Sequence, residues 1–398
     1  MTLMAGTAER MRTYSGPAIL GYGFRPFFLL GAVWAGLVVA LWLGILAGLV
    51  AIPMAFSPLE WHVHELLYGY VPAVVAGFLL TAVPNWTGRL PVTGRPLLLL
   101  VALWLGGRMA ILASNRIGLA SAALVDLLFL AVLATVIARE IVAGRNFRNL
   151  KVLALVGLLF AGNAVFHAEA SAMSGGGYGI RIGIGAAILL ITVIGGRIVP
   201  SFTRNWLARE QPGRLPAPFG RFDAVCVAVG AVAIGVWVWV PQAVSTALLA
   251  GMAGVLHAMR LGRWAGYRAA GEPLVLVLHV AYAFVPIGFL LLALAITAPG
   301  LVMASGALHG WTVGAIGTMT LAVMTRASLG HTGQALVASP TTQFIYLAVV
   351  VAAVARVLSA FDLWRDATLK VSATAWVLAF AVFVLRFGPL LVKPRAGA

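Results

Sequence analysis

Two histidines and a glutamate stand at the start of a long apolar segment. The stretch WHVHELLYGY (61–70) contains His62, His64 and Glu65, and the chain then stays apolar as far as Val83. Ionisable side chains inside a membrane span are costly, so their presence there points to a functional site. Imidazole is the common protein ligand of haem iron and of copper. This stretch therefore predicts a site that binds a cofactor or a metal ion.

Helical spacing separates the two histidines. Residues i and i+2 of a helix point about 200° apart, whereas residues i, i+3 and i+4 share one face. His64 shares a face with Trp61 and Tyr68, whereas His62 shares a face with Glu65, which could orient it. We therefore expect one histidine to face the helix bundle, while the other binds something else or nothing.

The remaining histidines supply further candidate ligands. His167 and His309 fall, like the first two, in the outer third of their predicted spans, and Asn163 lies one helical turn before His167. His279 lies about two turns from the inner end of its span. His331 follows an inner helix end, and for His257, also at an inner end, hydrogen bonding to interfacial water is the preferred interpretation.

Two charged residues lie at the same depth as the outer histidines. Arg108 and Asp126 occupy the outer parts of two consecutive spans. One interpretation is a buried ion pair. The other is that Arg108, together with Arg181, contacts the propionates of a haem, because an anionic cofactor would relieve the cost of a buried cation.

The composition predicts the elements that position these residues. Of the 398 residues, 62% are hydrophobic and only 10% are charged, and apolar runs of spanning length recur along the chain. About 20 helical residues cross the hydrocarbon core. We therefore predict an all-α polytopic membrane bundle of about twelve transmembrane helices in one integral membrane domain, residues 1–398. The predicted spans are 26–50, 61–83, 96–114, 118–138, 150–172, 180–199, 223–240, 243–259, 273–297, 301–325, 341–358 and 370–392.

The distribution of charge predicts the orientation. The net charge is +16, but the basic residues lie in short loops, which argues against nucleic acid as a partner and for a lipid bilayer. With the N-terminus inside, 21 of the 27 Lys and Arg residues fall in inner segments and 5 in outer segments. The positive-inside rule then predicts that both termini are cytoplasmic.

A faint internal repeat suggests three units of four helices. VPNWT (83–87) ends the second span and VPSFT (199–203) ends the sixth, while the tenth ends in VMTR (323–326). The alternative is a chance match in a sequence of low diversity.

The inner face carries a second polar set. Arg25, Arg197, Arg326 and His331 lie in segments rich in Gly, Pro and aromatic residues. We expect them to order the inner ends of the first, sixth and tenth spans. Either interfacial anchoring or a second ligand site that includes His279 would account for them.

The motifs that the sequence lacks exclude several kinds of site. The single cysteine, Cys226, excludes a disulfide framework, a CxxC motif and covalent CxxCH haem attachment, so any haem is held non-covalently. The sequence also lacks GxxxxGK[ST] and HExxH, which argues against a P-loop and against that class of zinc enzyme.

Six segments, in order along most of the chain, resemble the NnrS family of bacterial membrane proteins. They are GFRPFFLLGA (23–32), WHVHELLYGY (61–70), AGFLLTAVPNWTG (76–88), GNAVFH (162–167), GGRIVPSFTRNW (195–206) and HGWTVGAIGTMTLAVMTRASLGHTG (309–333). The resemblance implies a twelve-helix protein of the bacterial inner membrane that contains haem b and copper. It also implies a role in denitrification and in the response to nitric oxide and nitrosative stress.

The chain also resembles, more distantly, the main subunit of haem–copper oxidases and nitric oxide reductases. That subunit holds a haem between histidines on its second and tenth spans, where this chain has His62 or His64 and His309. The sixth and seventh predicted spans contain no histidine, so the copper site of that subunit is missing here. The likeness is one of fold and position.

Together these lines give a specific expectation for the ligands. His64 is the preferred axial ligand of haem b, with His309 as its partner or as the anchor of a second site, and Arg108 and Arg181 are the candidate propionate contacts. His62, backed by Glu65, and His167, backed by Asn163, are the better candidates for copper. The full set of predicted metal ligands is His62, His64, His167, His309, His331 and His279.

Three functions remain open at this point. The first is a haem and copper protein that binds or converts nitric oxide as an enzyme, a sensor or a protective binder. The second is a twelve-span transporter of a small anion or a metal complex, with a site at the membrane midplane. The third is a scaffold for a larger membrane complex. The sequence does not predict the oligomeric state.

Overall fold

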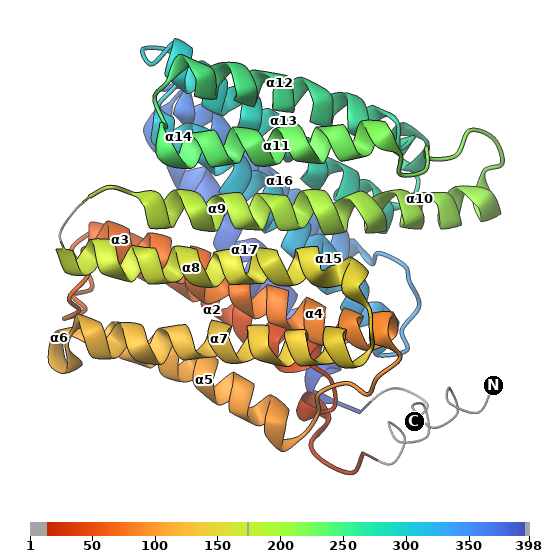
Figure 1. Cartoon of the computed structure of the whole chain (residues 1–398), viewed down its shortest axis with the longest axis horizontal. Coiled ribbons are helices and arrows are strands. Elements are labelled where there is room, and N and C mark those ends of the chain that lie inside the picture. The colour runs from red at the N-terminus through yellow and green to blue at the C-terminus, as the bar shows by residue number, and fades with distance from the viewer. Residues whose placement is uncertain (1–13, 173–174, 395–398) are drawn as a thin grey trace. The chain divides into compact units, whose positions relative to one another are not determined.

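Long helices make up the protein (Figure 1). The computed structural model describes residues 14–172 and 175–394. Within these residues, twelve helices are long and apolar enough to cross a membrane, which confirms the predicted polytopic helical bundle and places the chain in contact with a lipid bilayer. They are α2 (Phe24–Leu46), α3 to α4 (Pro58–Thr87), α5 (Arg95–Leu112), α7 (Leu119–Ala143), η3 with α8 (Phe147–Ala172), α9 to α10 (Tyr178–Glu210), α11 (Arg221–Trp239), α12 (Val244–Gly262), α13 (Pro273–Thr297), α14 to α15 (Ala304–His331), α16 (Pro340–Ala360) and α17 (Arg365–Val392).

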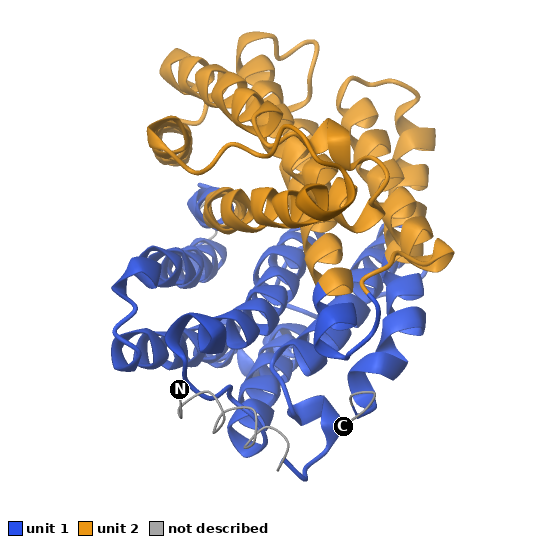
Figure 2. Cartoon of the chain, turned by 90° about the vertical axis from the view of Figure 1, so that its right-hand side faces the viewer, with its two compact units in different colours: residues 1–183, 327–335, 380–398 blue, residues 184–326, 336–379 orange. Residues whose placement is uncertain are grey.

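The described chain forms two compact units (Figure 2). Unit 1 comprises residues 1–183, 327–335 and 380–398, and unit 2 comprises residues 184–326 and 336–379. Three of the four boundaries fall within helices, namely α9 (Tyr178–Leu190), α15 (Thr318–His331) and α17, and the fourth, between residues 335 and 336, falls in the loop after α15. The arrangement in three four-helix units stays a prediction.

Three spans contain a π-helical segment. These segments are η2 (Glu65–Tyr70), η4 (Ile191–Gly195) and η6 (Gly310–Gly317), and they interrupt the second, sixth and tenth spans. A π-helical segment is uncommon and occurs frequently at functional sites, because the extra residue loosens the regular hydrogen-bond ladder. The segments η2 and η6 directly follow His64 and His309. The interruption recurs in every fourth span, which is the period of the sequence repeat.

The helix that carries His64 starts at a defined cap. Ser57 accepts a hydrogen bond from the Glu60 backbone N–H, and Glu60 accepts one from the Ser57 N–H at 2.8 Å. This capping box, with Pro58 in the first helical turn, satisfies donors that would otherwise lack partners. The helix α3 (Pro58–His64) therefore begins almost one turn before the predicted span.

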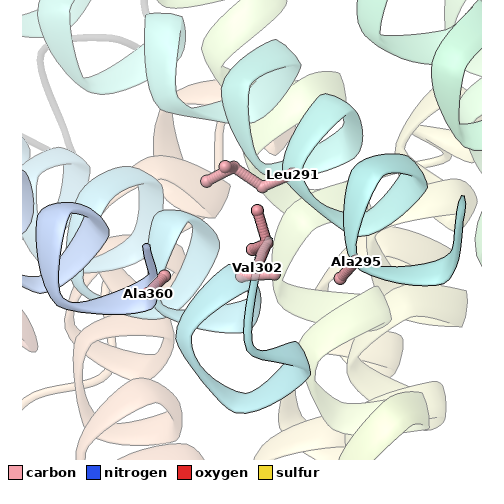
Figure 3. Packing of buried hydrophobic residues seen from close by; sticks show 5 residues of the cluster. Leu291, Ala295, Val302 and Ala360 are labelled. Carbon is pink, nitrogen blue, oxygen red and sulfur yellow. The ribbon is translucent and has the colours of Figure 1, made fainter. Parts of the chain in front are cut away.

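Small residues bring helices of unit 2 close together around His309. Leu291, Ala295, Val302, Ala307 and Ala360 form a buried apolar cluster (Figure 3). A Cβ atom on Gly306 would lie 2.4 Å from the Cβ of Ala360, so α14 (Ala304–His309) and α16 approach at a distance that only glycine permits. This contact fixes the start of the span that carries His309.

Candidate metal centre

Asp126 lies at the centre of a buried His–Asp–His group in unit 1. The Oδ2 atom of Asp126 lies 3.2 Å from Nε2 of His64 and 3.1 Å from Nε2 of His167. Across residues 14–172 and 175–394, this is the one group of three side chains whose ligand atoms lie close enough to hold a metal ion. The three side chains come from α3, α7 and α8 (Leu150–Ala172) and are at most 4% exposed.

Helix packing explains why these side chains meet. The helix α7 packs against both α5 and α8 in unit 1 (Figure 1). A Cβ atom on Gly107 of α5 would lie 2.8 Å from Oδ1 of Asp126, so glycine is needed where α5 passes this carboxylate. Asp126 therefore lies between α5 and α8. It contacts Arg108 from α5, and His167 and Asn163 from α8.

Glu65 and Arg108 extend the group. Glu65 Oε1 lies 2.9 Å from Nδ1 of His64, and Glu65 Oε2 accepts hydrogen bonds from Arg108 NH1 at 2.9 Å and from Trp34 Nε1 at 2.7 Å. Arg108 also donates to Asp126 through NH2. The ion pair of Arg108 and Asp126, one of the two alternatives from the sequence, is therefore present, and Arg108 bridges both carboxylates.

The π-helical segment makes room for this arginine. A Cβ atom on Gly69 would lie 2.2 Å from Arg108 NH1 and 2.9 Å from Glu65 Oε2. The Gly69 carbonyl also accepts a hydrogen bond from Trp104 Nε1 at 2.9 Å. Any side chain at position 69 would therefore compete with the guanidinium for the same space.

Asn163 orients the centre from α8. Its Nδ2 donates to Asp126 Oδ2 at 2.7 Å, and its Oδ1 lies 3.2 Å from His64 Nε2. The sequence predicted Asn163 as the residue that backs His167 and Glu65 as the residue that backs His62. In the structure Asn163 contacts His64 and Asp126, and Glu65 contacts His64, Arg108 and Trp34.

The centre has an uneven charge. Glu65 and Asp126 together carry two negative charges against the one positive charge of Arg108, and all three side chains are buried. With both histidines neutral, the cluster carries one excess negative charge. An unbalanced buried charge is costly, so a monovalent cation is needed. Either a proton on His64, whose two ring nitrogens face the two carboxylates, or a bound monovalent metal ion would balance it.

The donor set fits a metal ion. Nitrogen and oxygen ligands about 2.0–2.2 Å from a transition metal lie roughly 3 Å from one another, which matches the separations around Asp126 Oδ2. Imidazole suits copper, zinc and iron. The contact between Glu65 and His64 Nδ1 is the carboxylate–histidine contact that usually orients a metal-binding imidazole.

The same packing does not fit His64 as an axial haem ligand. Nε2 of His64 lies 3.2 Å from both Asp126 Oδ2 and Asn163 Oδ1, inside the polar cluster. The rings of Phe56, Tyr68 and Phe166 lie 5.3–6.0 Å from its imidazole ring, where a planar macrocycle would need space.

The other predicted ligands lie outside this group. In unit 1, the His62 ring stacks on Trp42 with centroids 4.1 Å apart, and the His331 ring stacks on Tyr22 at 5.6 Å. The structure therefore groups His167 with His64 and not with His62. Arg181 has its Cζ 4.7 Å from the centroid of the Tyr178 ring.

Two predicted ligands lie in unit 2. Nδ1 of His309 lies 2.6 Å from the carbonyl oxygen of Ser305, and Nε2 of the buried His279 lies 2.7 Å from Oγ1 of Thr203. Because His309 belongs to unit 2 and His64 to unit 1, the pairing of these two histidines stays a prediction.

A second buried polar cluster in unit 2 was missed from the sequence. Arg260 donates to Asp223 at 3.0 Å, to the Thr192 carbonyl of η4 at 3.0 Å and to the Tyr282 hydroxyl at 2.8 Å. His257 Nδ1 lies 2.9 Å from that hydroxyl. The expectation that His257 bonds interfacial water is therefore wrong, because its side chain is fully buried. Asp223, an acid at the edge of a span, was the available signal.

Two of the inner-face arginines make contacts that order helix ends. Arg25 NH1 donates to the carbonyl oxygens of Leu391 and Lys393 at 2.9 and 2.6 Å, at the end of α17 in unit 1. Arg326 has its Cζ 4.1 Å from the centroid of the Phe202 ring in unit 2. A cation is favourable where carbonyl groups end a helix.

The fold and the centre define a class, a multi-pass helical membrane protein with a buried cluster of imidazole and carboxylate donors. The family model for the NnrS protein matches residues 18–395, and the chain therefore belongs to the NnrS family. Membership suggests a membrane protein of the nitric oxide response. A search of curated proteins finds no match.

Proposed function

We propose that the chain is a copper- and haem b-binding protein of the bacterial inner membrane that binds or converts nitric oxide. The observation that carries the copper part is the buried group of His64, Asp126 and His167 with its one excess negative charge. Family membership supports the role in the nitric oxide response.

Charge and donor chemistry favour copper at this centre. Cu(I) is monovalent, so it would balance the cluster without a further anion. His64 and His167 would supply imidazole nitrogens and Asp126 a carboxylate oxygen, a set that copper accepts. Bound copper would supply one-electron chemistry. The remaining residues hold the ligands in place, because Glu65 orients His64, Asn163 orients Asp126, and Arg108 offsets one carboxylate.

A different histidine supports the haem part of the proposal. The short contact between His309 Nδ1 and the Ser305 carbonyl requires a proton on Nδ1, which leaves Nε2 as the basic nitrogen of a neutral ring. Haem-binding and metal-binding histidines usually make such a contact. We therefore assign the axial role to His309. The guanidinium of Arg108 is held by two carboxylates, and the propionate role of Arg181, which belongs to unit 1, stays a prediction.

Metal analysis of purified variants tests the copper assignment. His167→Ala and Asp126→Asn should each lose the copper that the wild-type protein retains, because the first removes one of three donors and the second replaces an anionic carboxylate by a neutral, weaker amide oxygen. His62→Ala is the matched control, since His62 lies in the same span as His64 but outside the group. Loss of copper in His62→Ala, with copper retained in His167→Ala, would show that the assignment is wrong.

The optical spectrum tests the haem assignment separately. Protein from haem-replete cells should show a Soret band with b-type α bands, and His309→Ala should bleach or shift that band while the protein still inserts. A colourless wild-type preparation would remove the haem part and leave the copper part standing.

A further inference from the structure

An apolar groove runs between α16 and α17 in unit 2. It has a volume of about 420 Å³, within the roughly 300–1,000 Å³ that is typical of ligand sites. The groove is open, and its walls come from Val351, Ala355 and Leu358 on α16 and from Ala367 and Val371 on α17. Trp364, which is 82% exposed, lies at the loop end of the groove. Thr368 is the one lining residue with a hydroxyl group. That hydroxyl donates hydrogen bonds to backbone carbonyls of its own turn.

The loop at this end of the groove has a strained backbone. Between α16 and α17, Asp362 has φ of 60° and Trp364 has φ of 44°. A positive φ is unusual for a residue other than glycine, and for a bulky residue such as tryptophan it is an outlier. Such strain is found where the surrounding structure holds a side chain in a required place, often at a ligand site. Here it holds the indole of Trp364 against the groove.

Two arginines flank the same end. Arg356 follows the groove residue Ala355, and Arg365 follows Trp364. Arg356 NH1 donates a hydrogen bond to the hydroxyl of Ser359 at 2.7 Å, and Arg365 is exposed. Within residues 14–172 and 175–394, neither arginine forms a salt bridge with Asp or Glu, although Asp362 and Asp366 are near in sequence. This combination favours an external anion, and a guanidinium suits a phosphate group in particular.

We propose that the groove binds one anionic phospholipid. An acyl chain would lie along the apolar walls between α16 and α17, and the phosphate would lie between Arg356 and Arg365. Trp364 would stand at the junction of chain and headgroup, the depth at which indole rings are enriched in membrane proteins. The inference is independent of the copper and haem proposals.

The lining argues against a quinone. A quinone ring needs hydrogen-bond donors for both of its carbonyl oxygens, and the lining residues offer only the indole N–H of Trp364 besides the engaged hydroxyl of Thr368. A hydrocarbon chain needs no donor. The phosphate is the charged part of the lipid, and Arg356 and Arg365 are the sequence neighbours of the lining residues Ala355 and Trp364.

Native mass spectrometry of the full-length protein with phosphatidylglycerol tests the proposal. Ala355→Phe and Val351→Trp each fill the groove, so each should weaken binding of the first phosphatidylglycerol at least about tenfold. Leu248→Phe, on the exposed face of α12 away from the groove, is the matched control and should bind as wild type does. The double variant Arg356→Gln/Arg365→Gln should lose the preference for phosphatidylglycerol over phosphatidylcholine, whereas Arg116→Gln, an exposed arginine of unit 1, should keep it.

A second measurement locates the lipid. Phosphatidylglycerol with brominated acyl chains should quench the tryptophan fluorescence of wild type more than that of Trp364→Phe. Equal lipid binding in wild type and both groove-filling variants would overturn the proposal. So would equal affinity for the two lipids in the wild-type protein, or a quinone extracted from the groove in place of a phospholipid.

Discussion

At the scale of single residues, the balance between two carboxylates and one arginine governs the centre. Asp126 contacts His64, His167, Asn163 and Arg108, and every one of these partners is buried. Removal of one partner from such a network costs more than an isolated hydrogen bond, because the remaining groups stay buried without compensation. Variants that change the charge of one of these side chains but keep its size therefore test the role of the charge.

Glu65→Gln separates charge from shape. The amide oxygen of Gln can still accept a hydrogen bond from Nδ1 of His64, and the cluster loses its excess negative charge. The amide NH₂ then faces the donors of Arg108 and Trp34, which adds to the loss. We expect the affinity for Cu(I) to fall by about 10- to 100-fold, the usual effect of losing a group that supports a metal ligand. A competition titration with a Cu(I) chelator measures this affinity.

Glu169→Gln is the control for that variant. Glu169 also belongs to unit 1, but it accepts hydrogen bonds from the backbone N–H groups of Tyr178 and Gly179 at the start of α9. Its replacement should leave the Cu(I) affinity unchanged. Equal affinities of Glu65→Gln and the wild type would show that the charge of Glu65 does not act on the metal.

At the scale of elements, two π-helical segments supply backbone carbonyl groups that accept hydrogen bonds from side chains of other helices. In η2 the carbonyl of Gly69 accepts from Trp104, and in η4 the carbonyl of Thr192 accepts from Arg260. Carbonyl groups that leave the regular ladder become available to side chains from other helices. Both buried polar clusters therefore depend on an irregular helix.

Gly69→Ala tests this dependence. The added Cβ would lie 2.2 Å from Arg108 NH1, so the arginine or the helix must move. Overpacking of this kind costs about 1–3 kcal/mol. We expect a lower free energy of unfolding in a detergent titration, together with weaker copper binding.

Gly157→Ala is the matched control within a helix of the same unit. Nothing lies within 4 Å of a Cβ atom at Gly157 of α8. Alanine is favoured over glycine in a helix interior by about 1 kcal/mol, so this variant should be neutral or more stable. If the two variants behaved alike, the close approach at Gly69 would have no consequence.

At the scale of the whole molecule, the predicted orientation places both termini in the cytoplasm. The basis is the excess of Lys and Arg in segments on the predicted inner side. An alkaline phosphatase fusion after Ala398 should therefore be inactive, and a fusion after Arg116, in a predicted outer segment, should be active. The reverse pattern would show that the orientation is the opposite one and that the metal centre lies in the inner half of the bilayer.

Hydropathy and charged residues determined much of the fold from the sequence alone. Twelve apolar runs predict twelve spans because the need to cross the hydrocarbon core is a property of each segment by itself. The same local reasoning identified His64, His167, Arg108 and Asp126 as ionisable groups in spans. The capping box at Ser57 was equally readable, because its two partners are three residues apart.

Only the tertiary structure decided which of these residues meet. The sequence paired His62 with His167, whereas the structure joins His64 to His167 through Asp126. The sequence expected Glu65 to back His62, whereas the structure gives Glu65 contacts with His64, Arg108 and Trp34. The approach of α5 to α7 at Gly107 depends on contacts between helices distant in sequence. Spanning a membrane is a local property of a segment, but a metal centre is a property of how segments pack.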